Sequence, residues 1–187
     1  MNWLDLKQAV QGYAKRSDIP HGMLLPAAEQ RIYYGEQNTP AVRVDAMRAT
    51  MVANDGAMAP FEFLEAIKVY PCGRPDEPLD YHPLSVVHQQ GGYSWDQGAL
   101  VLPDGGRVEI IYYQRLPSPV EDTDANWLME FTPNVYLSSM LIEAARWSVD
   151  DVLGAREAAQ YTSTVQALLS QQNKAASSGA RLVMRRR

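Results

Sequence analysis

The sequence is poor in the residues that most directly signal chemistry. It holds one cysteine, Cys72, in 187 residues, which excludes both an intramolecular disulfide and a metal cluster built on cysteines. Its three histidines form no HExxH pattern, and neither a GxGxxG motif nor a P-loop motif is present. We therefore predict no catalytic residue, no cofactor site and no metal site, and we expect a protein that is not an enzyme.

Long apolar runs are absent as well. No segment approaches the roughly 20 apolar residues that span a bilayer. Residues 1–16 mix charged with apolar residues and lack the continuous apolar stretch of a signal peptide. We therefore expect no membrane association and a protein that folds in a reducing cytoplasm.

Charge is divided unevenly along the chain. The net charge is −5, yet residues 174–187 contain five of the 17 basic residues and no acid, which leaves 12 bases against all 22 acids in residues 1–173. The acidic body argues against a protein that is wrapped by nucleic acid. A short basic segment of this kind is typical of an interaction tail that binds an acidic surface or a phosphate backbone.

Two groups of residues admit more than one interpretation. Asp80 and His82 stand close together, but because no GxSxG motif accompanies them we interpret His82 as a surface histidine. The aromatic residues of the middle region either stack nucleobases or fill a core or subunit interface. We favour the second, because few bases lie among them. These residues are Tyr93, Trp95, Tyr112 and Tyr113.

Helical periodicity occurs at both ends of the chain. Apolar residues recur every three or four positions in four segments, which are residues 2–15, 24–34, 132–149 and 151–172. Ser148 followed by Asp151 resembles a capping box and is expected to start the last segment. Because each segment has one apolar face that needs a partner, we predict a bundle of two N-terminal and two long C-terminal helices.

The middle of the chain favours strands and turns. The turn signals are Asn54-Asp55-Gly56, Asp96-Gln97-Gly98 and Asp104-Gly105-Gly106, and the expected strands are residues 42–52, 63–71, 93–95, 99–102 and 107–114. The predicted fold is therefore α+β. Its parts are the N-terminal bundle helices in residues 1–36, a β-rich insertion in 42–117, the C-terminal bundle helices in 126–173 and an extended basic tail in 174–187.

A series of short motifs follows these elements along nearly the whole chain. They are Ala27–Gly35, Pro60–Tyr70, Arg74–Tyr81, Gly98–Pro103, Val108–Tyr113 with Leu116-Pro117, Asn126–Leu128, Pro133–Leu137 and Leu141–Ala145. In this order they resemble the head-to-tail adaptor (connector) proteins of short-tailed and related tailed bacteriophages. The sequence departs from that family at Ser138-Ser139, where an aromatic residue is common.

The resemblance implies a structural virion protein at the head-tail junction. It implies a homo-oligomeric ring, a dodecamer, that is assembled in the host cytoplasm and joins the portal protein to a tail nozzle or tail-tube protein. The ring would help retain packaged DNA until genome ejection, and DNA would pass through its channel without specific recognition. The tail would dock on the portal through Lys174, Arg181, Leu182, Val183, Met184, Arg185, Arg186 and Arg187.

A small nucleic-acid-binding protein is the alternative function. It would use the same basic tail but explains no other feature of the sequence. It predicts an affinity for DNA that falls steeply with salt and disappears when residues 174–187 are removed. A tail that docks on the portal and a tail that docks on DNA would have the same sequence pattern, so the sequence does not decide between these two partners.

Overall fold

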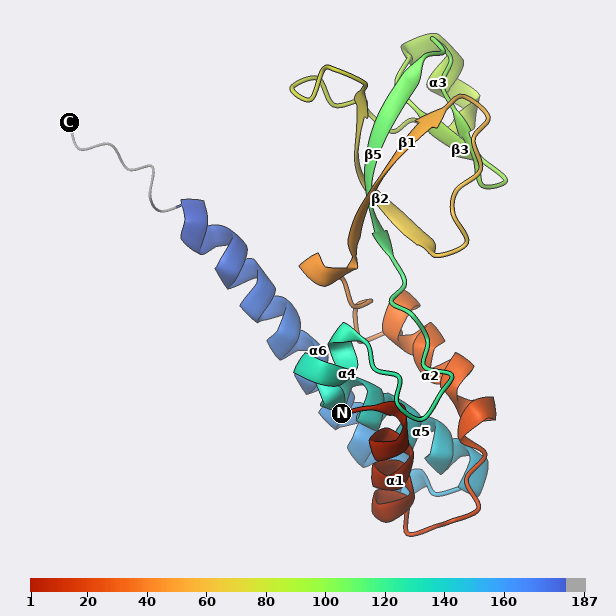
Figure 1. Ribbon diagram of the computed structural model, residues 1–187, viewed down its shortest axis with the longest axis vertical. Coiled ribbons are helices and arrows are strands. Elements are labelled where there is room, and N and C mark those ends of the chain that lie inside the picture. Colours follow the sequence, from red (N-terminus) through yellow and green to blue (C-terminus); the bar gives the residue numbers. More distant parts are fainter. Residues whose placement is uncertain (181–187) are drawn as a thin grey trace, which may run out of the picture. The chain divides into compact units, whose positions relative to one another are not determined.

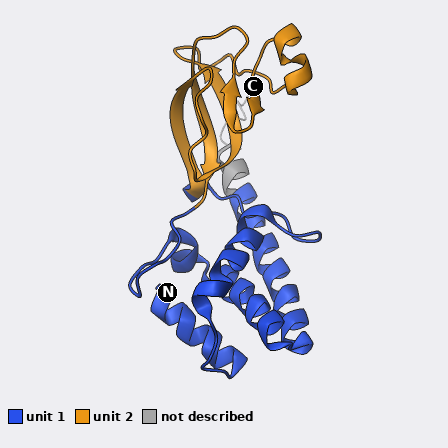
Figure 2. Ribbon diagram, turned by 90° about the vertical axis from the view of Figure 1, so that its right-hand side faces the viewer, with its two compact units in different colours: residues 1–46, 116–187 blue, residues 47–115 orange. Residues whose placement is uncertain are grey.

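The chain divides into two compact units. The computed structural model describes the backbone of residues 1–180 and the side chains of residues 1–174. Unit 1 consists of Met1–Ala46 and Leu116–Arg187, and unit 2 consists of Met47–Arg115, as Figure 2 shows by colour. Unit 1 is helical and unit 2 contains the strands, which confirms the predicted α+β class.

Unit 1 is a helical bundle built around α5 (Figure 1). The helix α5 contacts every other helix of the unit, because most of its residues between Val135 and Ala145 are buried. Its neighbours are α1 (Trp3–Ala14), α2 (His21–Tyr34), α4 (Trp127–Phe131) and α6 (Asp151–Ala180), and α5 itself covers Pro133–Ser148. The bundle therefore contains the predicted N-terminal and C-terminal helix pairs. Among the described residues of unit 1 it adds one short helix, α4.

The helix α6 is longer than the sequence pattern indicated. Its buried apolar residues are Leu153, Tyr161, Val165 and Leu168, and between Leu168 and Lys174 no side chain is buried. The backbone nevertheless stays helical to Ala180, so residues 174–180 continue the helix instead of beginning the extended tail. A search for apolar periodicity does not detect a stretch of helix that has no buried apolar face.

The connection between α5 and α6 differs from the predicted capping box. Ser148 belongs to the last turn of α5, and its hydroxyl donates to the carbonyl of Ala145. Val149 follows in the left-handed region (φ 57°), and Asp150 caps α6 by accepting a hydrogen bond of 2.9 Å from the amide of Leu153. The predicted cap at Ser148 is therefore wrong by two residues.

Val149 adopts a backbone conformation that favours glycine. A β-branched residue is strained in the left-handed region, and 83% of Val149 is exposed, so packing offsets little of that strain. We expect Val149→Gly to raise the free energy of unfolding by about 1 kcal/mol, as measured by urea denaturation. The control is Val152→Ala, which removes an equally exposed valine from helical backbone and should change stability by less than about 0.5 kcal/mol. A loss of stability in Val149→Gly would contradict the strain.

Unit 2 is a small antiparallel sheet with a hairpin. The strands β1 (Arg48–Asn54), β5 (Arg107–Gln114) and β2 (Phe63–Pro71) lie in that order, and β3 (Ser94–Asp96) pairs with β4 (Ala99–Val101). A short helix, α3 (Leu84–Gln90), precedes the hairpin. The strand expected over residues 42–52 starts only at Arg48, because residues 45–47 form a turn of 3₁₀ helix.

The core of unit 2 contains most of the aromatic group singled out in the sequence. Tyr93 and Tyr112 are buried, and Trp95 packs against the same cluster. Phe63 stacks on Tyr112 with ring centroids 5.2 Å apart. This confirms the core interpretation for these residues over nucleobase stacking.

No helix in the part of the chain that the structure describes combines the length and the apolar character needed to cross a bilayer.

Candidate docking surfaces

A buried ionic network fixes the junction of α2 and α5 in unit 1. The side chain of Arg31 is only 2% exposed, and its guanidinium bonds to the carboxylate of Glu143. It also donates to Glu36 at 2.7 Å and to the hydroxyl of Ser139 at 3.2 Å. The Ser139 hydroxyl in turn donates to the carbonyl of Ala28 at 2.9 Å. Ser139 therefore supplies a polar contact to the buried arginine.

A second buried network joins α2, α5 and the segment before α4. The hydroxyl of Tyr136 donates to Glu29 at 3.1 Å and accepts from the side-chain amide of Asn126 at 3.0 Å. The hydroxyl of Tyr33 lies 3.3 Å from the hydroxyl of Tyr136 and shares a hydrogen bond with it. Burial raises the pKa of Tyr136 well above its ordinary value, so the phenol stays neutral and acts as a hydrogen-bonding group. Both networks join helices of the bundle through buried hydrogen bonds, which favours a rigid unit.

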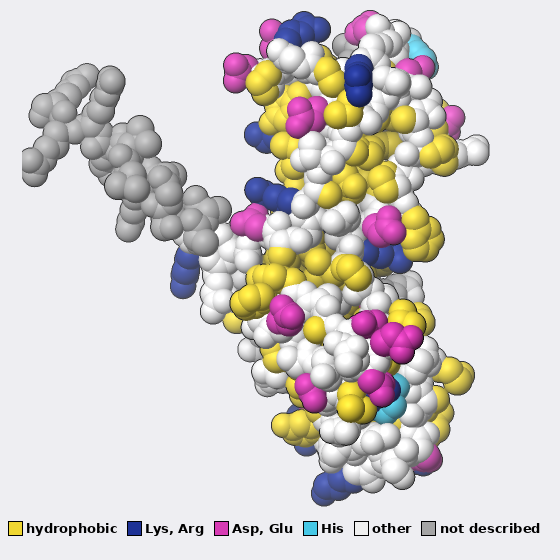
Figure 3. All heavy atoms as spheres, viewed as in Figure 1, with side chains coloured by type: hydrophobic (Ala, Val, Ile, Leu, Met, Phe, Trp, Pro, Cys, Tyr) yellow, Lys and Arg dark blue, Asp and Glu magenta, His cyan; other side chains and the backbone are white. Residues whose placement is uncertain are grey.

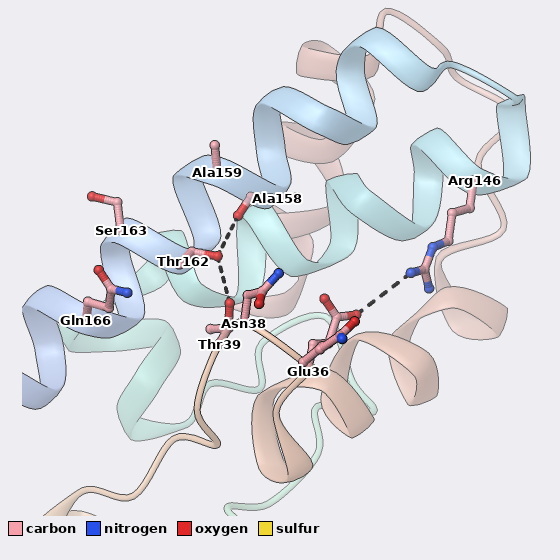
Figure 4. A pocket seen from close by; sticks show the side chains of 10 residues that line it. Glu36, Asn38, Thr39, Arg146, Ala158, Ala159, Thr162, Ser163 and Gln166 are labelled. Carbon is pink, nitrogen blue, oxygen red and sulfur yellow. Dashed lines mark hydrogen bonds and ion pairs between the residues drawn. The ribbon is translucent and has the colours of Figure 1, made fainter.

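A hollow of unit 1 lies between the exposed side of α6 and the turn at residues 36–39. We call it the α6 groove. Figure 4 shows its central part, which has a volume of about 690 Å³ and is lined by Glu36, Gln37, Asn38, Thr39, Arg146, Ala158, Ala159, Thr162, Ser163 and Gln166. Two smaller hollows adjoin it at Glu36 and Arg146, one of about 290 Å³ towards Asp150 and Asp151 and one of about 260 Å³ towards Arg31 and Glu143. We include both in the groove.

The turn at residues 36–39 forms one wall of the α6 groove. Thr39 and Thr162 share a hydrogen bond of 2.7 Å between their hydroxyls, and Thr162 also donates to the carbonyl of Ala158. Glu36 lies 3.8 Å from the guanidinium of Arg146. Figure 4 marks this ion pair with a dashed line. The floor consists of small side chains, so the groove offers room for a bulkier partner.

This groove was not predicted from the sequence. In the structure Ala158 is half-buried at the groove. The available signal was the spacing of Ala155, Ala159 and Ser163, which are small and recur every four residues away from the buried face. The opposite wall comes from residues more than 100 positions earlier, and no local pattern indicates that it packs there.

Acids outnumber bases in the α6 groove. The carboxylates are Glu36, Glu143, Asp150 and Asp151, and the guanidinium groups are those of Arg31 and Arg146. Both arginines already pair with Glu36 and Glu143. The negative charge that the two arginines do not neutralise therefore lies mainly at the end of the groove that contains Asp150 and Asp151.

His21 is a buried histidine at the start of α2. Only 9% of the residue is exposed, its ring lies edge-on to Trp3, and neither ring nitrogen has a hydrogen-bond partner within the described residues. Burial, and secondarily the charge of Lys7, lowers the pKa of His21 below its ordinary value of 6.5. Burial therefore favours the neutral form of this imidazole in the folded chain.

This environment predicts that stability depends on pH. Because the pKa of His21 is lower in the folded chain, the unfolded chain binds more protons at mildly acidic pH. Stability should be full above about pH 6.5 and should fall as pH drops from there towards the folded pKa. Thermal unfolding of His21→Gln should lose this component, whereas the exposed His88→Gln should keep it. An identical pH profile for wild type and His21→Gln would contradict the prediction.

Large apolar side chains are exposed on both units, as the yellow atoms in Figure 3 indicate. Phe61 of unit 2 is 87% exposed, and Met58 in the same loop is also exposed. In unit 1, Val149 and Val152 are each 83% exposed. Exposed apolar groups of this kind are common in proteins that are buried by partners in an assembly.

The predicted portal-binding residues fall largely outside the described structure. Lys174 is exposed on α6. Arg181, Leu182, Val183, Met184, Arg185, Arg186 and Arg187 lie outside the described residues. The structure therefore neither brings these side chains together nor separates them.

Comparison with known proteins gives the chain a family. Within the described residues, no group of three or more His, Cys, Asp or Glu side chains is placed to hold a metal ion. No curated protein matches the chain. The family of the SU10 adaptor protein matches residues 1–185, which is nearly the full length. The chain therefore belongs to the SU10 adaptor family, whose members are structural proteins of phage virions.

Proposed function

We propose that this phage adaptor forms a ring at the head-tail junction of the virion. The ring is a dodecamer that joins the portal protein to a tail nozzle or tail-tube protein and helps retain packaged DNA until ejection. The observation that carries the proposal is the family match over residues 1–185, since an adaptor associates with portal and tail components. Assembly takes place in the host cytoplasm.

Each of the two units has its own role in the proposed ring. Residues 1–36 and 126–173 supply the bundle, whose buried networks suit a rigid ring wall. The β-rich insertion, residues 42–117, faces the tail side or a neighbouring subunit. Its exposed Phe61 loop offers an apolar contact there. This structural role requires no catalytic residue, cofactor or metal.

The basic C-terminal segment attaches the ring to the portal. Lys174 and residues 181–187 supply five positive charges and three consecutive apolar side chains. Ordering a chain segment on binding costs on the order of 1–2 kcal/mol per residue in backbone entropy, so one segment binds weakly. Repetition around a ring makes the attachment firm through avidity. DNA passes the acidic body without specific recognition, because like charges repel.

The proposal is tested by native mass spectrometry of the full chain and a 1–180 variant, with and without portal from the same genome. We expect rings from both forms and portal binding only by the full chain, with an affinity loss of at least about 100-fold for the variant. A monomer that ignores the portal in both forms would contradict the proposal. Salt-sensitive DNA binding that vanishes in the 1–180 variant would then favour the nucleic-acid-binding alternative.

A further inference from the structure

We infer that, in a ring without portal, residues 181–187 of one copy occupy the α6 groove of the next copy, and that the portal displaces them. The inference rests on the proposed ring. It concerns where the basic segment lies before the portal is bound, and it assigns the groove a ligand: a basic peptide of a second copy of this chain.

The chemistry of the α6 groove matches this segment. Residues 181–187 read Arg-Leu-Val-Met-Arg-Arg-Arg, with apolar side chains between basic ones. The groove offers small apolar side chains at Ala155, Ala158 and Ala159, and at its other end it has the carboxylates of Asp150, which also caps α6, and Asp151. Hydroxyl and amide groups, including those of Ser163 and Gln166, line the same hollow and can bond to an extended backbone.

The length of α6 keeps residues 181–187 of the same copy away from the acidic end of the groove. A helix rises about 1.5 Å per residue, so Ala180 lies about 33 Å from Ala158 and about 44 Å from Asp151 along α6. Seven residues span at most about 25 Å when fully extended. The segment therefore cannot reach the middle or the acidic end of its own groove, whereas the groove of a neighbouring copy carries no such restriction.

The positive charge of residues 181–187 suggests why they would be held in the groove before the portal binds. Four arginines within seven residues, repeated around a ring, would bind nucleic acid without specificity in an infected cell. Seating them against Asp150 and Asp151 keeps them from phosphate backbones. Because the same residues bind the portal, the portal and the groove compete for the segment, and portal binding must empty the groove.

Photo-cross-linking of the full chain tests the inference. A photoreactive residue replaces Val183, isotope-labelled and unlabelled copies are mixed, and products are mapped by mass spectrometry. We expect cross-links between copies to residues 36–39, 146 and 155–166, and we expect portal to shift them to portal peptides. Cross-links confined to one copy, cross-links outside the groove, or groove cross-links that persist after portal binding would overturn the inference.

Charge variants provide an independent readout. Asp150→Asn with Asp151→Asn removes two charges from the groove but keeps a side chain that caps α6. We expect the groove cross-link yield to fall about three- to tenfold and salt-sensitive binding to duplex DNA to rise. The control, Glu62→Gln with Asp76→Asn, removes two exposed carboxylates of unit 2 and should change neither. Equal effects of both pairs would count against the groove.

The outcomes separate this inference from the proposed function. A chain that stays monomeric by native mass overturns both, because there is then no second copy to supply the segment. A ring that binds portal through residues 181–187 but gives no cross-link to the groove overturns only the position of the segment before portal binding.

Discussion

Arg31→Met is expected to lower the free energy of unfolding by on the order of 3–5 kcal/mol. The substitution leaves the carboxylate of Glu143 buried beside α2 with only the more exposed Arg146 as an ionic partner. The substitution also removes the guanidinium group that donates a hydrogen bond to the hydroxyl of Ser139. The measurement is urea denaturation followed by far-ultraviolet circular dichroism, which reports on the helices.

Two further variants make this result specific to the buried pair. Arg31→Met combined with Glu143→Leu should recover most of the lost stability, because an apolar pair of similar volume replaces both charges. Arg74→Met breaks an ion pair with Glu77 in which both side chains are 64% exposed, and it should cost less than about 1 kcal/mol. If Arg31→Met costs as little as Arg74→Met, the network does not stabilise the bundle.

Leu100→Ala is expected to destabilise unit 2 by about 3 kcal/mol. Leu100 is fully buried between the β3-β4 hairpin and the three-stranded sheet, among side chains that include Val108 and Ile110. Hydrogen exchange measured by mass spectrometry should show protection of the β5 amides falling about 100-fold, which is the same free energy.

The matched control for this variant lies on β1. Val52→Ala removes two methyl groups from a side chain of the same sheet that is half-exposed, and it should change protection only slightly. Comparable losses of protection in both variants would mean that the hairpin does not close the core of unit 2. The buried aromatic group around Trp95 would then need another explanation.

Several elements could be predicted from the sequence because their signals are local. The bounds of β2 and β5 agree with the predicted strands, since an apolar pattern ends at a proline or glycine turn in each case. The start of β1 was misplaced because Val42 and Val44 are as apolar as strand residues. They are instead buried in unit 1, where the amide of Val42 donates to the carbonyl of Ile32.

The features that sequence analysis missed depend on contacts between distant residues. The left-handed backbone at Val149 ends α5 after Ser148. Because α5 includes Ser148, the residue that caps α6 is Asp150. The α6 groove requires Glu36 and Arg146 to meet the outer side of α6. Membership of the adaptor family was predictable, because it depends on many weak motifs in one order and not on a single contact.

Electron microscopy of intact virions with this chain labelled would show where the adaptor lies. We expect label, and ring-shaped density around the DNA channel, between the portal and the first tail component. Label on the capsid faces or at the distal end of the tail, or virions that contain none of this chain, would contradict it.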